Sequence, residues 1–153
     1  MDIRRILVTG LIATLFAACS PTQDCPVTIP NGSTPPGESA NQLYHGNGQL
    51  WTALWPQGVI EFSPAGPGEI RPDGSMAMKF PWWRAEAVSG AIEVSGERLD
   101  GTGSGVEIEA PDGYGDSGFQ ASALVFPSEG CWHVTARAGD AQLTFIVEIS
   151  QTR

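Results

Sequence analysis

The stretch CWHVTARAGDAQLTFIVEI, residues 131–149, decides the fold class of this chain. Apolar and polar side chains alternate along both of its halves, as they do in half-buried β-strands. One face of the first half carries Trp132, Val134 and Ala136, and one face of the second half carries Leu143, Phe145, Val147 and Ile149. Between the halves, Gly139-Asp140 is a two-residue turn of the kind that the twist of paired strands prefers. Residues 131–149 therefore predict an antiparallel hairpin with one buried face.

Shorter segments upstream have the same strand-like character. They are residues 49–54, 58–63, 75–84, 91–99, 106–110 and 118–127. Trp55-Pro56-Gln57-Gly58 fits a type I turn, so the first two segments are expected to form a hairpin. Pro81 interrupts the third segment and implies a sheet edge or a bulge there. About eight strands without any helical period predict an all-β fold, a single antiparallel β-sandwich.

The composition and charge agree with one exported domain. A chain of 153 residues suits a single core, and 19 Gly with 12 Pro suit many turns. We divide the chain into a signal peptide (1–18), a Pro/Gly-rich tether or irregular wrap (19–48) and a β-sandwich domain (49–153). The formal charge of −9 argues against nucleic acid as a partner, because the phosphate backbone would be repelled.

The N-terminus carries the features of an export signal. Arg4 and Arg5 precede an apolar run, residues 6–18, which is too short for a comfortable membrane span. Cys19 follows small residues and resembles the lipidated cysteine of bacterial lipoproteins, although Phe16 replaces the usual leucine. The resemblance implies a lipid anchor at Cys19, and Ser20 after it favours the outer membrane of a double-membrane cell. The alternative is ordinary signal cleavage nearby.

The two remaining cysteines are expected to pair. If Cys19 carries lipid, Cys25 and Cys131 are left in an oxidising compartment, where a disulfide between them is the natural state. The alternative is a metal site in which Cys131 and His133, two residues apart on one strand face, act with His45. No methionine follows Cys131 to serve as a soft axial ligand, so we predict no metal and no cofactor.

No residue pattern points to catalysis. Gly115-Asp116-Ser117-Gly118 superficially resembles a protease serine loop, but its surroundings do not extend the match and a turn is the simpler reading. Glu107 and Glu109 lie on one strand face and are interpreted as solvated rather than as a glycosidase pair. Residues 112–116 could offer oxygen ligands to calcium, yet they lack the spacing of a calcium-binding loop. We therefore predict that the protein is not an enzyme.

Tryptophan supplies the best candidate binding site. The chain contains five Trp, and the adjacent Trp82 and Trp83 must point to opposite faces of a strand. One of them can enter the core, while the other is exposed or is covered by the N-terminal segment. Lys79 and Arg84 bracket the pair, and an exposed Trp beside a cation suits a sugar ring or a peptide.

Two resemblances extend this interpretation. The hairpin over residues 131–149 resembles the closing strand pair of immunoglobulin-like domains, which implies an immunoglobulin-like sandwich. Residues 31–38, 50–56, 78–84 and 130–132 resemble a group of uncharacterised exported bacterial proteins, which implies no activity. We expect a lipid-anchored, extracytoplasmic binding module for a glycan, the cell wall or a protein. A purely structural envelope lipoprotein and, less favoured, a small hydrolase or metal-binding protein remain the alternatives.

Overall fold

The two final strands form the longest antiparallel pair of the protein. In this computed structural model, which describes residues 24–152, they are β9 (Gly130–Ala138) and β10 (Ala141–Gln151). They pair from Gly130 opposite Ile149 to Ala138 opposite Ala141. Gly139 closes the turn with φ of +54°, a conformation that favours glycine. The hairpin predicted from residues 131–149 is confirmed.

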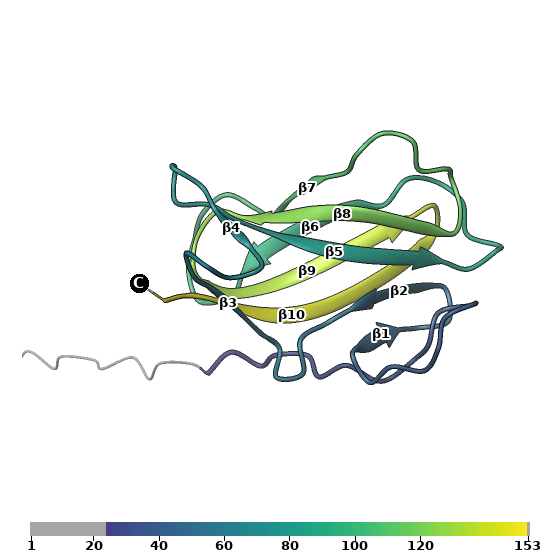
Figure 1. The fold of residues 1–153 in the computed structure, drawn as a ribbon, viewed down its shortest axis with the longest axis horizontal. Coiled ribbons are helices and arrows are strands. Elements are labelled where there is room, and N and C mark those ends of the chain that lie inside the picture. The colour runs from purple at the N-terminus through teal and green to yellow at the C-terminus, as the bar shows by residue number, and fades with distance from the viewer. Residues whose placement is uncertain (1–23, 153) are drawn as a thin grey trace, which may run out of the picture.

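Two sheets pack face to face as a sandwich (Figure 1). The four-stranded sheet has the order β3-β10-β9-β6, in which the outer strands are β3 (Val59–Phe62) and β6 (Glu93–Arg98). The six-stranded sheet has the order β1-β2-β5-β8-β7, with β4 also on β5. Its strands are β1 (Tyr44–Gly46), β2 (Leu50–Ala53), β4 (Glu69–Ile70), β5 (Met76–Arg84), β7 (Glu107–Glu109) and β8 (Phe119–Phe126). Residues 24–152 contain no helix that could span a lipid bilayer.

All the strands predicted from the sequence are present, each within two residues of its expected ends, and the all-β sandwich is confirmed. The short strands β1 and β4 were not predicted, because they lie in segments dominated by turn residues. The predicted hairpin of residues 49–63 is wrong. The turn forms, with the amide of Gly58 donating to the carbonyl of Trp55 at 3.0 Å, but β2 and β3 enter different sheets.

The pairing of β3 also corrects the prediction that every strand pair is antiparallel. β3 runs parallel to β10, from Val59 opposite Glu148 to Phe62 opposite Gln151. Leu50 of β2 and Ile60 of β3 are both fully buried in the one core between the sheets. Short strands with one apolar face can bury it from either sheet, so the residue pattern alone does not choose between them.

Aromatic rings fill the space between the sheets. Phe80 and Trp82 point inward from β5 and contact Phe145 of β10, with ring centroids 5.9 and 6.2 Å from it. Trp132 of β9 contacts Phe126 at 6.2 Å. Both buried indoles keep a polar partner, because Nε1 of Trp82 donates to Ser122 Oγ at 2.8 Å and Nε1 of Trp132 donates to the Ser128 carbonyl at 3.1 Å. This layer fixes which face of β5 is turned outward.

Pro81 lies in β5, an interior strand, but one side of β5 has no described strand paired with it at this residue. β5 pairs along its whole length with β8, whereas β2 and β4 share its other side and pair only with residues 82–84 and 76–77. The carbonyl of Pro81 accepts the Thr52 hydroxyl at 2.8 Å, so it faces β2. A strand residue directs its N–H and C=O to the same side, so the missing N–H of proline falls in this gap. The expected edge position is therefore local.

The N-terminal segment lies along the free side of β10 (Figure 1). Cys25 forms a disulfide with Cys131, which confirms the predicted pair and indicates an oxidising, extracytoplasmic environment. Thr28 exchanges two hydrogen bonds of 2.8 Å with the backbone of Ile146, and Asn47 Nδ2 donates to the Gln142 carbonyl at 2.7 Å. These contacts satisfy backbone groups of β10 beyond the reach of β3, so the edge is not open to another chain.

The disulfide should contribute strongly to stability. It joins positions 106 residues apart, and the chain-entropy model gives about 4–5 kcal/mol for a loop of that size. We expect the Cys25→Ser/Cys131→Ser variant to lose about that free energy of unfolding, as measured by urea denaturation. Reductant should destabilise the parent chain but leave the variant unchanged. Equal stability of the two proteins would show that the bridge is dispensable.

Candidate ligand-binding face

The outer face of the six-stranded sheet is set by the alternation along β5. Because Phe80 and Trp82 are buried, Lys79, Pro81 and Trp83 point to the opposite face. Antiparallel pairing places these outward residues opposite outward residues of β8, in the pairs Lys79–Ala123, Pro81–Ala121 and Trp83–Phe119. Glu109 of β7 lies opposite Ala123 on the same face.

Four aromatic side chains, here called the aromatic row, follow one another across this face: Tyr44, Trp83, Phe119 and Tyr114. The neighbouring ring centroids are 5.2, 5.3 and 6.0 Å apart in that order. Phe119 is 46% exposed and Tyr114 is 40% exposed, although both are large and apolar in character. A contiguous row of this kind, in contrast to single scattered apolar side chains, is typical of a contact surface.

The N-terminal segment covers one end of the row and leaves the other open. Trp51 lies opposite Trp83 in the sheet, but it is buried beneath the segment and donates from Nε1 to Ser33 Oγ at 3.0 Å. Trp83 is half-buried, and its Nε1 donates to Glu38 Oε1 at 3.1 Å. The Tyr44 hydroxyl donates to the other oxygen of Glu38 at 3.3 Å. The pKa of Tyr44 is raised, first by desolvation and second by the negative charge of Glu38.

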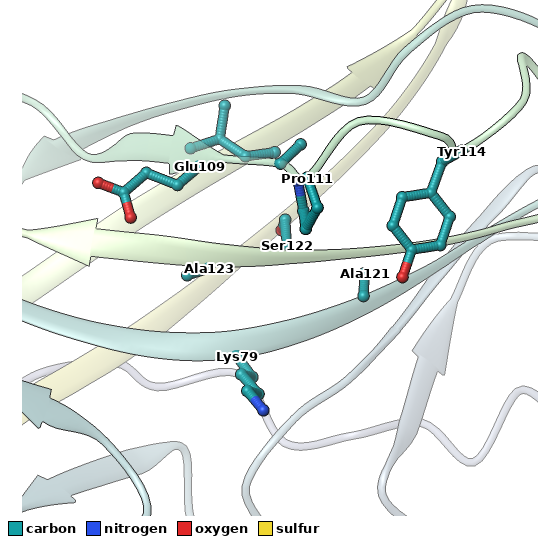
Figure 2. Close-up of a pocket in the computed structure, with 9 residues that line it drawn as sticks. Lys79, Glu109, Pro111, Tyr114, Ala121, Ser122 and Ala123 are labelled. Carbon is teal, nitrogen blue, oxygen red and sulfur yellow. The ribbon is translucent and has the colours of Figure 1, made fainter.

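Beside the row lies a shallow hollow of about 830 Å³ (Figure 2). Its floor is formed by the small outward residues of β8, Ala121 and Ala123. Figure 2 shows Tyr114 and Glu109 toward opposite ends of the hollow, with these alanines between them. Alternate residues on a strand are about 7 Å apart, so one row of small side chains between bulky ones creates the groove. A smaller hollow, lined by Glu38, Glu86 and Phe119 among others, also borders the row.

The polar groups at the margin are of both signs. Arg71 binds Glu109 through two parallel hydrogen bonds of 2.9 and 2.7 Å. This pairing holds the pKa of the Glu109 carboxyl below its usual range and raises the pKa of Arg71. Lys79 is exposed on β5 and forms no ion pair within residues 24–152. It is therefore a positive hydrogen-bond donor available to a ligand.

Two of the four predicted site residues are buried. Trp82 is part of the core, and Arg84 is only 3% exposed. The Arg84 guanidinium donates to the backbone carbonyls of Gly90, Gly115, Ser117 and Gly118. Burial lowers the pKa of Arg84, and Asp116 acts in the opposite direction. Arg84 therefore holds the loop of residues 115–118, whereas Trp83 and Lys79 are the predicted residues that reach the surface.

Phe119 and Tyr114, the most exposed members of the row, were not singled out in the sequence. Phe119 lies in the predicted strand of residues 118–127 and pairs with Trp83, so knowledge that this strand pairs with residues 75–84 would have revealed it. Tyr114 belongs to the loop between β7 and β8, and its position depends on the loop that Arg84 secures. No local pattern could have indicated that contact.

The alternative metal site is not formed. The thiol of Cys131 is consumed by the disulfide, and His133 Nδ1 lies 3.4 Å from Glu97 Oε1. His45 lies against the backbone of Thr144, where burial lowers the pKa of His45. Thr144 is four residues along β10 from Glu148, which pairs with Cys131, so His45 is distant from Cys131. Within the described part of the chain, no three His, Cys, Asp or Glu side chains gather to hold a metal ion.

Comparison of the chain with protein-family models, with curated proteins and with solved structures finds no match.

The role of Arg84 can be tested by its removal. We expect Arg84→Met to lower the free energy of unfolding by about 2–3 kcal/mol, because it leaves several carbonyl groups without their charged donor. The free energy of unfolding of Arg84→Lys should lie between those of the parent chain and Arg84→Met, because an ammonium group lacks the planar fork of the guanidinium group. The exposed Arg137→Met serves as control, with an expected change within about 0.5 kcal/mol. Urea denaturation measures all four proteins, and an unchanged Arg84→Met variant would contradict the assignment.

Proposed function

We propose that this protein is a lipid-anchored, extracytoplasmic binding module that holds its ligand on the aromatic row without catalysing a reaction. The observation that carries the proposal is the exposure of Phe119 and Tyr114 beside Trp83, next to a hollow with a floor of small residues. The polar margin of the row includes Lys79 and the carboxylates of Glu38 and Glu109, each of which accepts hydrogen bonds. Such groups are suited to hydrogen bonding a ligand, and the aromatic rings supply contact area.

The strand order supports an immunoglobulin-like topology for the module. Immunoglobulin constant-type domains arrange strands A to G in the orders A-B-E-D and C-F-G. If β2, β5, β6, β7, β8, β9 and β10 correspond to A to G, the sheets here contain the same two orders. The disulfide differs, because Cys131 in the F position joins Cys25 ahead of the first strand instead of the B strand. Such sandwiches have unrelated functions, so the face and not the fold supports binding.

The anchor at Cys19 lies outside the described residues and stays a prediction. Its support is the leader pattern at residues 4–19, together with the disulfide that indicates export. Cys25 is tied to β9, so the chain between Cys19 and Cys25 could reach about 20 Å at most. In Figure 1 the start of the described chain and the start of β9 lie at one end of the sandwich, while the end of β5 and the start of β8 lie at the other. A lipid at Cys19 would therefore leave the aromatic row at the end away from the membrane.

A purely structural envelope lipoprotein is the second candidate. The observation in its favour is the N-terminal segment, which already covers Trp51 and part of Trp83. That coverage stops before Phe119, so the two candidates differ in whether Phe119 has a use.

Lipidation is tested on the exported chain. We expect mass spectrometry to find a mature protein that begins at Cys19 and carries acyl chains, because two or more chains anchor a domain stably. Cys19→Ala should be recovered in the soluble extracytoplasmic fraction with the Cys25–Cys131 bridge intact. A mature N-terminus at another residue, without lipid, would show that the signal peptide is cleaved in the ordinary way and that the protein has no lipid anchor at Cys19.

The binding face is tested by sedimentation with purified envelope fractions, namely cell-wall sacculi, membrane vesicles and shed polysaccharide. We expect the chain with Cys19→Ala to sediment with one of them, and Phe119→Ser to lose that association. Leu99→Ser is a matched control, because Leu99 is 45% exposed and lies outside the row. Association that survives Phe119→Ser, or that falls equally in both variants, would favour the structural lipoprotein.

A further inference from the structure

We propose that the ligand of the aromatic row is an uncharged polysaccharide, bound as an extended chain of pyranose units; this inference rests on the proposed function above. Four features of the face favour this class of ligand: the spacing of the rings, the hydrogen-bonding groups beside them, the local charge and the strand pairing beneath them.

The spacing of the rings suits successive sugar units. Trp83, Phe119 and Tyr114 come from β5, β8 and the loop before β8, and the neighbouring centroids are 5.3 and 6.0 Å apart. That separation is close to the length of one pyranose unit in an equatorially linked chain. The C–H groups of a pyranose form apolar faces that pack on aromatic rings through dispersion. The rings are inclined to one another by 59° and 73°, so the row favours a twisted chain over a flat crystalline surface.

Hydrogen-bonding groups lie on both sides of the row. Glu38 accepts one donor at each carboxylate oxygen, from Trp83 and Tyr44, so each oxygen keeps a lone pair for a hydroxyl group. Lys79 offers donors across the hollow floored by Ala121 and Ala123. Hydroxyl groups both donate and accept, so a sugar can use the carboxylate and the ammonium together.

The charges of the face argue against an anionic ligand. Glu109 is paired with Arg71, whereas Glu38, Glu86 and Glu107 form no ion pair within residues 24–152. An anionic polymer would be repelled by these carboxylates and by the whole chain at −9. An uncharged ligand avoids this repulsion and can still use the carboxylates as hydrogen-bond acceptors.

The rings of the row lie on the outer face of the sheet, where a ligand contacts side chains. β5 is paired with β8 over residues 76–83 and with β2 over residues 82–84, but β7 pairs with β8 only at residues 123–125, so the other side of residues 119–122 of β8 has no strand partner within the described chain. An extended peptide would gain affinity by adding to that edge in the plane of the sheet, rather than by lying on the rings. A ligand on the face itself contacts side chains only, and such contacts suit a sugar.

The test is isothermal titration of the full exported chain with Cys19→Ala against chitohexaose, cellohexaose and xylohexaose. We expect at least one of these neutral oligosaccharides to bind at millimolar concentration or below. Phe119→Ser and Trp83→Ala should each weaken binding about tenfold or more, whereas Leu99→Ser should not. Thermal denaturation checks that each variant is folded, and Phe119→Ser, which changes an exposed side chain, keeps the test valid if Trp83→Ala unfolds. The affinity should be the same in low and high salt, because an uncharged ligand has no charge to screen.

The outcomes separate this inference from the function on which it rests. If no oligosaccharide binds while Phe119→Ser still abolishes association with an envelope fraction, the glycan is wrong and the binding face stands. Binding to a cationic peptide that weakens with salt and requires Phe119 would likewise replace the glycan with a peptide. If Phe119→Ser and Leu99→Ser behave as the parent chain in both experiments, the face and its ligand fall together.

Discussion

The alternation of side chains along β5 is the constraint on which the rest of the structure depends. Phe80 and Trp82 point inward and contact Phe145, and these ring contacts join the two sheets. The same alternation turns Pro81 and Trp83 outward, opposite Ala121 and Phe119 of β8. A slip of one residue would bury the surface set and expose the core set, so the packing of the core also fixes the aromatic row.

The strand beside the N-terminal segment shows how the sandwich protects an edge. β10 is the longest strand, and β3 pairs with only its last four residues. Thr28 and Asn47 satisfy backbone groups at Ile146 and Gln142, and the Cys25–Cys131 bridge holds this segment in place. A segment rich in proline and glycine can cover an edge through side chains and single hydrogen bonds without becoming a regular strand. The same segment reaches the aromatic row and covers Trp51 but not Phe119.

Prediction from the sequence succeeded where the signal is local. Alternation located the strands, because burial of one face leaves a period of two in any strand. It failed for the pairing of β2 and β3, because a short amphipathic strand can join either sheet and still bury its apolar side. It also failed for Arg84, since an arginine beside two tryptophans looks like a ligand contact. Whether it faces a ligand or the carbonyls of residues 115–118 depends on a loop distant in sequence.

By itself the sequence determined the all-β class, the strand positions and the Cys25–Cys131 pair, because composition and alternation depend only on neighbouring residues and on which cysteines are available. The tertiary structure alone decided that Trp82 is the inner and Trp83 the outer tryptophan, and that Phe119 and Tyr114 continue the row. It also decided that β3 crosses to the second sheet. These features arise from contacts between residues far apart in the chain, and such contacts form only when the sheets pack and the loops close over them.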